Sequence, residues 1–227
     1  QEIIFQYISA LIFIGNYNTA NDALSICSEY SERFIYLKAD LLHLQNQYDE
    51  AIGNLTYLIQ NTNSTSLKQQ SILKLTHCYK HIGHLDEAID ILNKIIQSPT
   101  ASDAIKIKAK VYSLAILIQN NDYDELQERI AELELIENNL KDYQKATLIR
   151  YRAVNYAMKN KFIEAINEIN TAIDICKNTD SRLILNCYYF RGEIYRHFKF
   201  FNNAYKDFLS CYKISFRNGD YNLRSLA

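Results

Sequence analysis

Residues 79–92 read Tyr-Lys-His-Ile-Gly-His-Leu-Asp-Glu-Ala-Ile-Asp-Ile-Leu, and they contain the pattern that decides the fold. Ala88 follows Leu85 by three positions and precedes Leu92 by four, so the three side chains share one face of a helix. Gly83 stands five positions before Ala88, where a chain that reverses direction needs a left-handed backbone. This stretch therefore predicts a tight turn between two helices that cross at Ala88.

The same pattern occurs six times along the chain, which indicates a solenoid of stacked helix pairs. Its central residues, spaced 31 to 39 positions apart, are Ala20, Ala51, Ala88, Leu126, Ala165 and Ala204. The predicted turn residues are Gly15, Asn46, Gly83, Asn121, Asn160 and Lys199. Glycine and asparagine tolerate a left-handed backbone better than other residues, so Lys199 departs from the pattern in the last unit.

These units resemble the tetratricopeptide repeat family, whose signature runs from an aromatic through Leu-Gly and Tyr to Ala, an aromatic and Pro. The last unit carries the signature at Tyr188, Arg191-Gly192, Tyr195, Ala204 and Phe208. The third unit carries it at Ile72, Leu75, Tyr79, Gly83, Ala88, Leu92 and Pro99. The resemblance implies an all-α fold, a right-handed superhelical solenoid of antiparallel helix pairs with about six repeats. Repeats longer than the usual length of about 34 residues are similar to those of bacterial transcriptional activators, peptide-sensing regulators and kinesin light chains.

We expect one continuous array over residues 1–227, because one proline and five glycines leave no linker that would separate two halves. The approximate repeats are 1–30, 31–65, 66–101, 102–141, 142–179 and 180–218. The chain begins with Gln1 and ends at Ala227, shortly after another helix would begin, so we expect it to be a fragment of a longer protein.

Composition limits the possible binding partners and the cellular compartment of the protein. A formal net charge of −1 argues against general binding of nucleic acid or of an anionic membrane. No stretch is apolar for long enough to span a bilayer. The five cysteines form no closely spaced pair, which is typical of a reducing compartment, so we expect a cytoplasmic protein. The sequence carries no signal for an oligomeric state.

Cysteine and histidine provide the only candidates for chemistry. Cys176 and Cys187 could sense redox changes, although buried apolar thiols are the favoured interpretation. His77 and His81 stand four positions apart, a spacing that can place two imidazoles on one metal. They lack the HExxH arrangement, and the chain has no phosphate-binding loop or nucleophile motif. We therefore expect no enzyme, cofactor or metal, and keep a metal-dependent enzyme using His77 and His81 as a distant alternative.

The family resemblance implies that the first helix of each pair lines a concave surface that binds a protein or peptide. The predicted partner-binding residues are Arg33, Tyr36, Asp40, His43, His77, Lys80, Lys108, Val111, Ile118, Arg150, Val154, Tyr189, Glu193 and Arg196. Apolar residues form the middle of this surface, whereas an outward helical face is usually charged. A bound peptide or amphipathic helix would cover it, with its acidic groups paired to the basic residues. In the alternative interpretation, the chain covers this face itself.

The sequence thus favours a protein-interaction module without catalysis. The first hypothesis is the sensor or partner-binding region of a larger regulatory protein. The alternative is a free-standing chaperone or assembly scaffold that binds an extended client segment.

Overall fold

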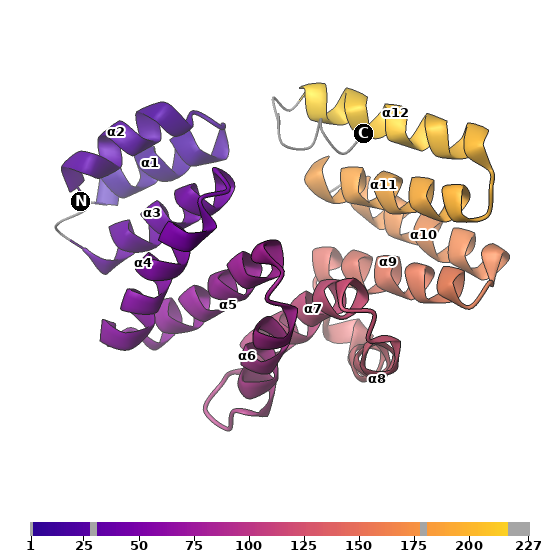
Figure 1. Cartoon of the computed structure of the whole chain (residues 1–227), viewed down its shortest axis with the longest axis horizontal. Coiled ribbons are helices and arrows are strands. Elements are labelled where there is room, and N and C mark those ends of the chain that lie inside the picture. Colours follow the sequence, from indigo (N-terminus) through magenta and orange to yellow (C-terminus); the bar gives the residue numbers. More distant parts are fainter. Residues whose placement is uncertain (1, 28–30, 178–180, 218–227) are drawn as a thin grey trace. The chain divides into compact units, whose positions relative to one another are not determined.

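The computed structural model describes residues 2–27, 31–177 and 181–217, and within these ranges it contains α-helices and one short 3-10 helix but no strand (Figure 1). The helices are α1 (Glu2–Phe13), α2 (Tyr17–Cys27), α3 (Glu32–Leu44), α4 (Tyr48–Asn61), α5 (Thr65–Ile82), α6 (Leu85–Gln97), α7 (Asp103–Gln119), α8 (Tyr123–Glu134), η1 (Glu137–Asn139), α9 (Asp142–Met158), α10 (Phe162–Cys176), α11 (Ser181–His197) and α12 (Phe201–Arg217). The prediction of an all-α fold is confirmed.

The chain divides into two compact units, residues 1–109 and 110–227, and the division falls inside α7. In the first unit, α1 packs on α2, α3 on α4 and α5 on α6, and each pair also contacts the next. In the second unit, α9 packs on α10 and α11 on α12, and α10 contacts α11. The expectation of one continuous array over residues 1–227 stays a prediction.

A left-handed residue ends the first helix of every pair. The φ angles are 79° at Gly15, 62° at Asn46, 85° at Gly83, 58° at Asn121, 57° at Asn160 and 64° at Lys199. All six predicted turn positions are therefore confirmed, including Lys199, whose side chain makes this conformation costly. In each turn the second helix starts two residues after the left-handed one, so the two helices reverse within a few residues.

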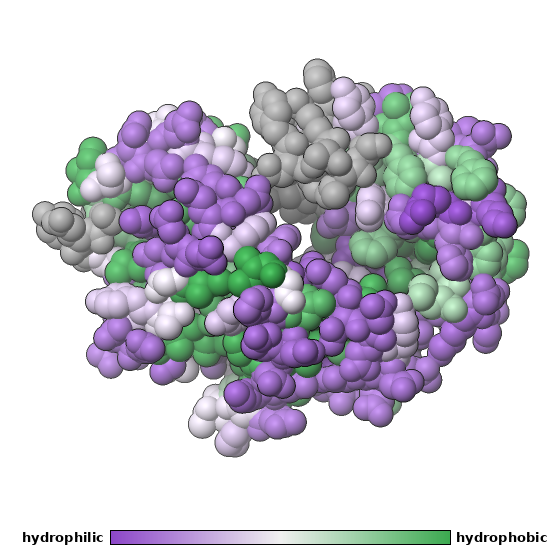
Figure 2. Space-filling model, viewed as in Figure 1, coloured by the Kyte–Doolittle hydropathy of each residue, from purple (hydrophilic) through white to green (hydrophobic). Residues whose placement is uncertain are grey.

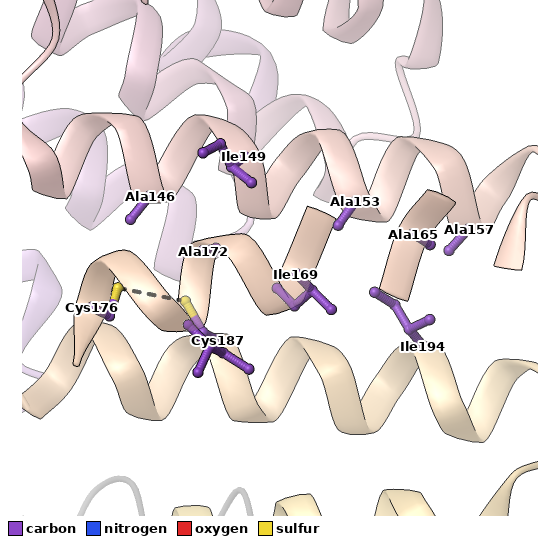
Figure 3. Packing of buried hydrophobic residues seen from close by; sticks show 11 residues of the cluster. Ala146, Ile149, Ala153, Ala157, Ala165, Ile169, Ala172, Cys176, Cys187 and Ile194 are labelled. Carbon is purple, nitrogen blue, oxygen red and sulfur yellow. Dashed lines mark hydrogen bonds between the residues drawn. The ribbon is translucent and has the colours of Figure 1, made fainter. Parts of the chain in front are cut away.

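The residue at each helix crossing is buried, and it is alanine in five of the six units. Ala20, Ala51, Ala88, Leu126 and Ala165 have no exposed surface, and Ala204 is 3% exposed. Figure 3 shows how the second unit uses small residues: Ala153 and Ala157 of α9 lie close to Ala165 of α10. Ile169 and Ile194 extend the same cluster towards α11. Each helix pair thus buries its apolar stripe against its neighbours.

Ion pairs link successive helices on the outside of this core. Arg152 of α9 contacts carboxylates from three elements: Glu134 at the end of α8, Glu137 in η1 and Glu168 in α10. Arg191 of α11 binds Asp207 of α12 with a nitrogen to oxygen distance of 2.7 Å, and Asn170 of α10 with 2.6 Å. Each arginine therefore joins its own helix to the elements before and after it in the sequence.

Candidate partner-binding surface

Within the first unit, α1, α3 and α5 lie side by side, and the predicted surface residues of α3 and α5 contact one another. Asp40 of α3 forms an ion pair with Lys74 of α5. The rings of His43 and His77 meet edge to face, with their centroids 6.1 Å apart. The sequence predicted both histidines on this surface, and the structure brings them together. Tyr36, Asp40 and Lys80 are half-buried on the same two helices.

An aromatic cluster surrounds His43, and we call it the histidine cluster: His43, Tyr48, His77 and His81. The ring centroid of His43 lies 5.6 Å from that of Tyr48 and 5.4 Å from that of His81. Tyr48 and His81 stack nearly parallel, 5.0 Å apart. Both ring nitrogens of His43 are enclosed and find no hydrogen-bond partner in the described part of the chain. Such enclosed polar atoms are uncommon in proteins and mark a site that a ligand could complete.

Burial and neighbouring lysines keep this cluster uncharged at neutral pH. Desolvation, followed by the positive charge of Lys74, lowers the pKa of His43 to about 4 and that of His77 to about 3. The pKa of His81 is also lowered, by burial and then by Lys80. Across the described ranges, no group of three or more His, Cys, Asp or Glu is placed to hold a metal ion. The arrangement is suited to contacts with an uncharged or apolar part of a partner.

Arg33 and Lys108 are the other predicted residues of the first unit. The guanidinium of Arg33 lies 4.0 Å above the ring of Phe5 and 2.8 Å from a carboxylate oxygen of Glu2, so it links α3 to α1. Its side chain remains 53% exposed and accessible to a partner. Lys108 is half-buried in the part of α7 that belongs to this unit.

In the second unit, α9 and α11 lie side by side and carry the remaining predicted residues together with α7. Ile118, Val154 and Tyr189 are half-buried. The ring of Tyr189 meets that of Phe190 edge to face at 5.7 Å. Glu193 and Arg196 pair with each other at 2.6 Å, one turn further along α11. Aromatic, apolar and charged side chains thus follow one another along α11.

Val111 and Arg150 differ from the other predicted residues because they are only 5% and 7% exposed. The guanidinium of Arg150 lies over the rings of Tyr151 and Phe190, at 4.7 Å and 4.9 Å from their centroids. At Val111, burial favours the interpretation in which the chain covers this face itself. The role of both residues in binding a partner stays a prediction.

Three residues that the sequence analysis did not place on this surface contact residues that it did place there: Tyr48, Tyr151 and Phe190. Each is next to or near a predicted residue, but none falls on the three- and four-residue spacing that selected the surface. Tyr48 begins the second helix of its pair and reaches His43 and His81 across the turn. The abundance of tyrosine was the only sequence signal for Tyr48 and Tyr151. It does not show which rings meet in the folded chain.

The described helices include none that is long and apolar enough to cross a membrane.

Comparison with known proteins relates the chain to others by fold alone. No family model matches the sequence, and no curated protein matches it. A tetratricopeptide repeat protein from Parabacteroides merdae is 19% identical with a TM-score of 0.72, covering 99% of this chain and 83% of its own. A Rap protein, solved in complex with Competence and Sporulation Factor, is 14% identical with a TM-score of 0.67, covering 88% of this chain and 60% of its own.

Kinesin light chain repeats from Podosopora anserina, described as nearly identical and TPR-like, are 16% identical with a TM-score of 0.58 and cover 82% of this chain and 95% of theirs. The predicted resemblance to tetratricopeptide repeat solenoids is therefore confirmed at the level of the fold.

Proposed function

We propose that this chain is a peptide- or protein-binding module that acts as the sensor or partner-binding region of a larger regulatory protein. The partner is held on the surface formed by the first helices of the pairs, which are the odd-numbered helices of each unit. The observation that carries the proposal is that predicted surface residues contact the neighbouring odd-numbered helix. His43 meets His77 between α3 and α5, and Arg150 meets Phe190 between α9 and α11.

The chemistry of these faces supports binding. A solvent-facing helical stripe is usually charged, whereas these stripes carry half-buried rings and aliphatic side chains. Tyr36 and Tyr189 each offer a large ring with a polar tip, a combination that is common where binding energy is concentrated. Because a tyrosine side chain has few rotatable bonds, it loses little entropy when a partner covers it.

The similar Rap protein was crystallised in complex with Competence and Sporulation Factor, which supports a comparable arrangement in this chain. We propose that the partner here is an extended peptide or an amphipathic helix, because either can place alternate side chains along a row of parallel helices. Binding would then be read out by other parts of the regulatory protein.

A random dodecapeptide display library selected against the chain would test the proposal, with calorimetry of the enriched peptides. We expect Tyr36→Ala or Tyr189→Ala to weaken binding about tenfold or more, because each substitution removes a ring from the surface. Matched controls are Tyr57→Ala on α4 and Tyr205→Ala on α12, since these tyrosines are 53% and 67% exposed on even-numbered helices. Enriched peptides that bind the Tyr36 and Tyr189 variants as tightly as the parent chain would refute this surface.

A further inference from the structure

Arg150 differs from the other arginines whose side chains the structure describes. The other five each pair with a carboxylate; the pairs are Arg33 with Glu2, Arg129 with Glu125, Arg152 with Glu168, Arg191 with Asp207, and Arg196 with Glu193. Arg150 forms no ion pair or hydrogen bond with any residue in the described ranges, and its Nε atom is enclosed without a partner. It is also only 7% exposed. A permanently charged group is therefore buried without a counter-charge from the part of the chain that the structure describes.

The surroundings of Arg150 hold the guanidinium in place but do not neutralise it. The faces of Tyr151 and Phe190 attract the cation, which offsets part of the cost of removing it from water. The neighbouring thiol of Cys187 is uncharged, because burial raises its pKa to about 12. Glu193 on the same helix as Phe190 is already paired with Arg196. The two rings thus hold the guanidinium in a fixed position, and its positive charge can bind an anion.

We infer that Arg150 is the anchor for a carboxylate of the bound peptide, an inference that rests on the proposed function. A planar guanidinium matches a carboxylate through two parallel hydrogen bonds, and the two rings keep its plane fixed. A phosphate group carries more charge and is usually bound by a cluster of arginines. Here the nearby Arg191 is already paired with Asp207, so one positive charge remains, and it balances one carboxylate.

The residues beside Arg150 describe the rest of the preferred ligand. Val154 lies one turn further along α9, on the same helical face, and is half-buried. Tyr189 adjoins Phe190 on α11 and is also half-buried. An acidic residue flanked by apolar or aromatic ones fits this part of the surface. The carboxylate can belong to an aspartate or glutamate side chain or to the C-terminus of the peptide.

The stability of the ligand-free chain separates this role from a purely structural one. Replacing a buried, unpaired charge with an apolar side chain of similar length removes the desolvation cost that the charge adds to the free energy of folding. If Arg150 serves a ligand, Arg150→Met leaves the Tm of the ligand-free chain unchanged or higher, as is common where function opposes stability. If Arg150 serves packing alone, the same variant melts at a lower temperature.

Four pools of dodecapeptides provide the probe for binding. Each pool has randomised aliphatic and aromatic residues around one fixed central position. That position is glutamate in two pools and glutamine in the other two. For each central residue, one pool has a free C-terminus and the other has an amidated C-terminus. The pools are incubated with the parent chain, Arg150→Met and Arg150→Lys, and the retained peptides are quantified by mass spectrometry. Lys206→Met is the control, since Lys206 is an exposed basic residue on α12, outside the predicted surface.

We expect the parent chain and Lys206→Met to retain a carboxylate-bearing pool about tenfold more than its amide counterpart. A preference for glutamate over glutamine identifies a side-chain carboxylate, and a preference for free over amidated ends identifies the C-terminus. Arg150→Met should abolish the preference and Arg150→Lys should weaken it, because lysine lacks the planar fork.

Two results would overturn the assignment of Arg150 while leaving the proposed function standing: peptides retained without any preference for a carboxylate, or the same preference in Arg150→Met. A lower Tm of the ligand-free Arg150→Met chain would also overturn it. If the parent chain retains none of the four pools, the proposed function itself fails, and this inference fails with it.

Discussion

The thiol sulfur of Cys187 in α11 lies 3.8 Å from the thiol sulfur of Cys176 at the end of α10, and both side chains are buried (Figure 3). The two residues that could sense redox changes are therefore neighbours. Their surroundings favour the alternative interpretation, since burial and the adjacent Cys176 raise the pKa of Cys187 to about 12. A thiol with such a pKa is a poor nucleophile at neutral pH.

Thiol labelling of the native chain checks this interpretation. Cys27 is half-buried, whereas Cys78, Cys176, Cys187 and Cys211 are buried. We expect an aromatic disulfide reagent to modify Cys27 first and the other cysteines only when the chain unfolds. Cys27→Ser should remove the fast phase. Rapid modification of Cys187 in the native chain would contradict the buried-thiol interpretation and revive a redox role.

Two glycines inside helices should respond oppositely to alanine. A Cβ atom at Gly192 would lie 2.7 Å from the ring of Phe208, where α11 crosses α12, while a Cβ at Gly53 in α4 would meet nothing within 4 Å. We expect Gly192→Ala to lower the free energy of unfolding by about 1–3 kcal/mol through overpacking. Gly53→Ala should raise it by about 0.5–1 kcal/mol through helix propensity.

Urea denaturation of both variants measures the difference. Combining Gly192→Ala with Phe208→Leu should restore part of the lost stability, because the smaller side chain relieves the contact. Equal effects of alanine at the two positions would show that α11 and α12 do not approach as closely as described.

The left-handed lysine in the last turn offers a stabilising substitution. Lys199 has a φ of 64°, where three other turns of the chain use asparagine. We expect Lys199→Asn to raise the free energy of unfolding by about 0.5–1 kcal/mol, because asparagine is less strained in this conformation. The same change at Lys159, which has a φ of −86°, should give no gain. A shift in the urea midpoint of the Lys199 variant, compared with the Lys159 variant, measures the effect.

Acid should destabilise the first unit through the histidine cluster. His43 and His77 have folded-state pKa values of about 4 and about 3, below the ordinary value of 6.5 for an unfolded chain. The unfolded chain therefore binds more protons, and stability falls as the pH drops below about 6.5 until it passes the folded-state pKa values. The lowered pKa of each of these histidines should reduce the free energy of unfolding by about 1–2 kcal/mol at about pH 5.

Unfolding followed between about pH 7.5 and about pH 5 tests this effect. His43→Gln and His77→Gln should each flatten the dependence of stability on pH, because glutamine does not titrate. His84→Gln is the matched control, since His84 lies outside the cluster with an exposed side chain that pairs with Glu87. An unchanged slope in the His43 and His77 variants would show that these rings are not buried as described.

The sequence alone predicted where the helices turn and cross. A left-handed turn favours glycine or asparagine, and a close helix crossing favours a small side chain, so these positions can be recognised in the sequence. Gly83 and Ala88 illustrate both rules, and the structure places them as expected. The spacing along each first helix also selected residues that meet between helices, such as His43 and His77.

The sequence thus determined the all-helical repeat fold, because backbone conformation and apolar periodicity are local properties of a chain. Only the tertiary structure decided which surface residues are exposed, paired or enclosed. Arg150 and Arg196 both stood on the predicted surface, yet one is buried between aromatic rings and the other is exposed beside Glu193. That difference depends on how α9 and α11 pack together, and packing between helices that are distant in the sequence has no local signature.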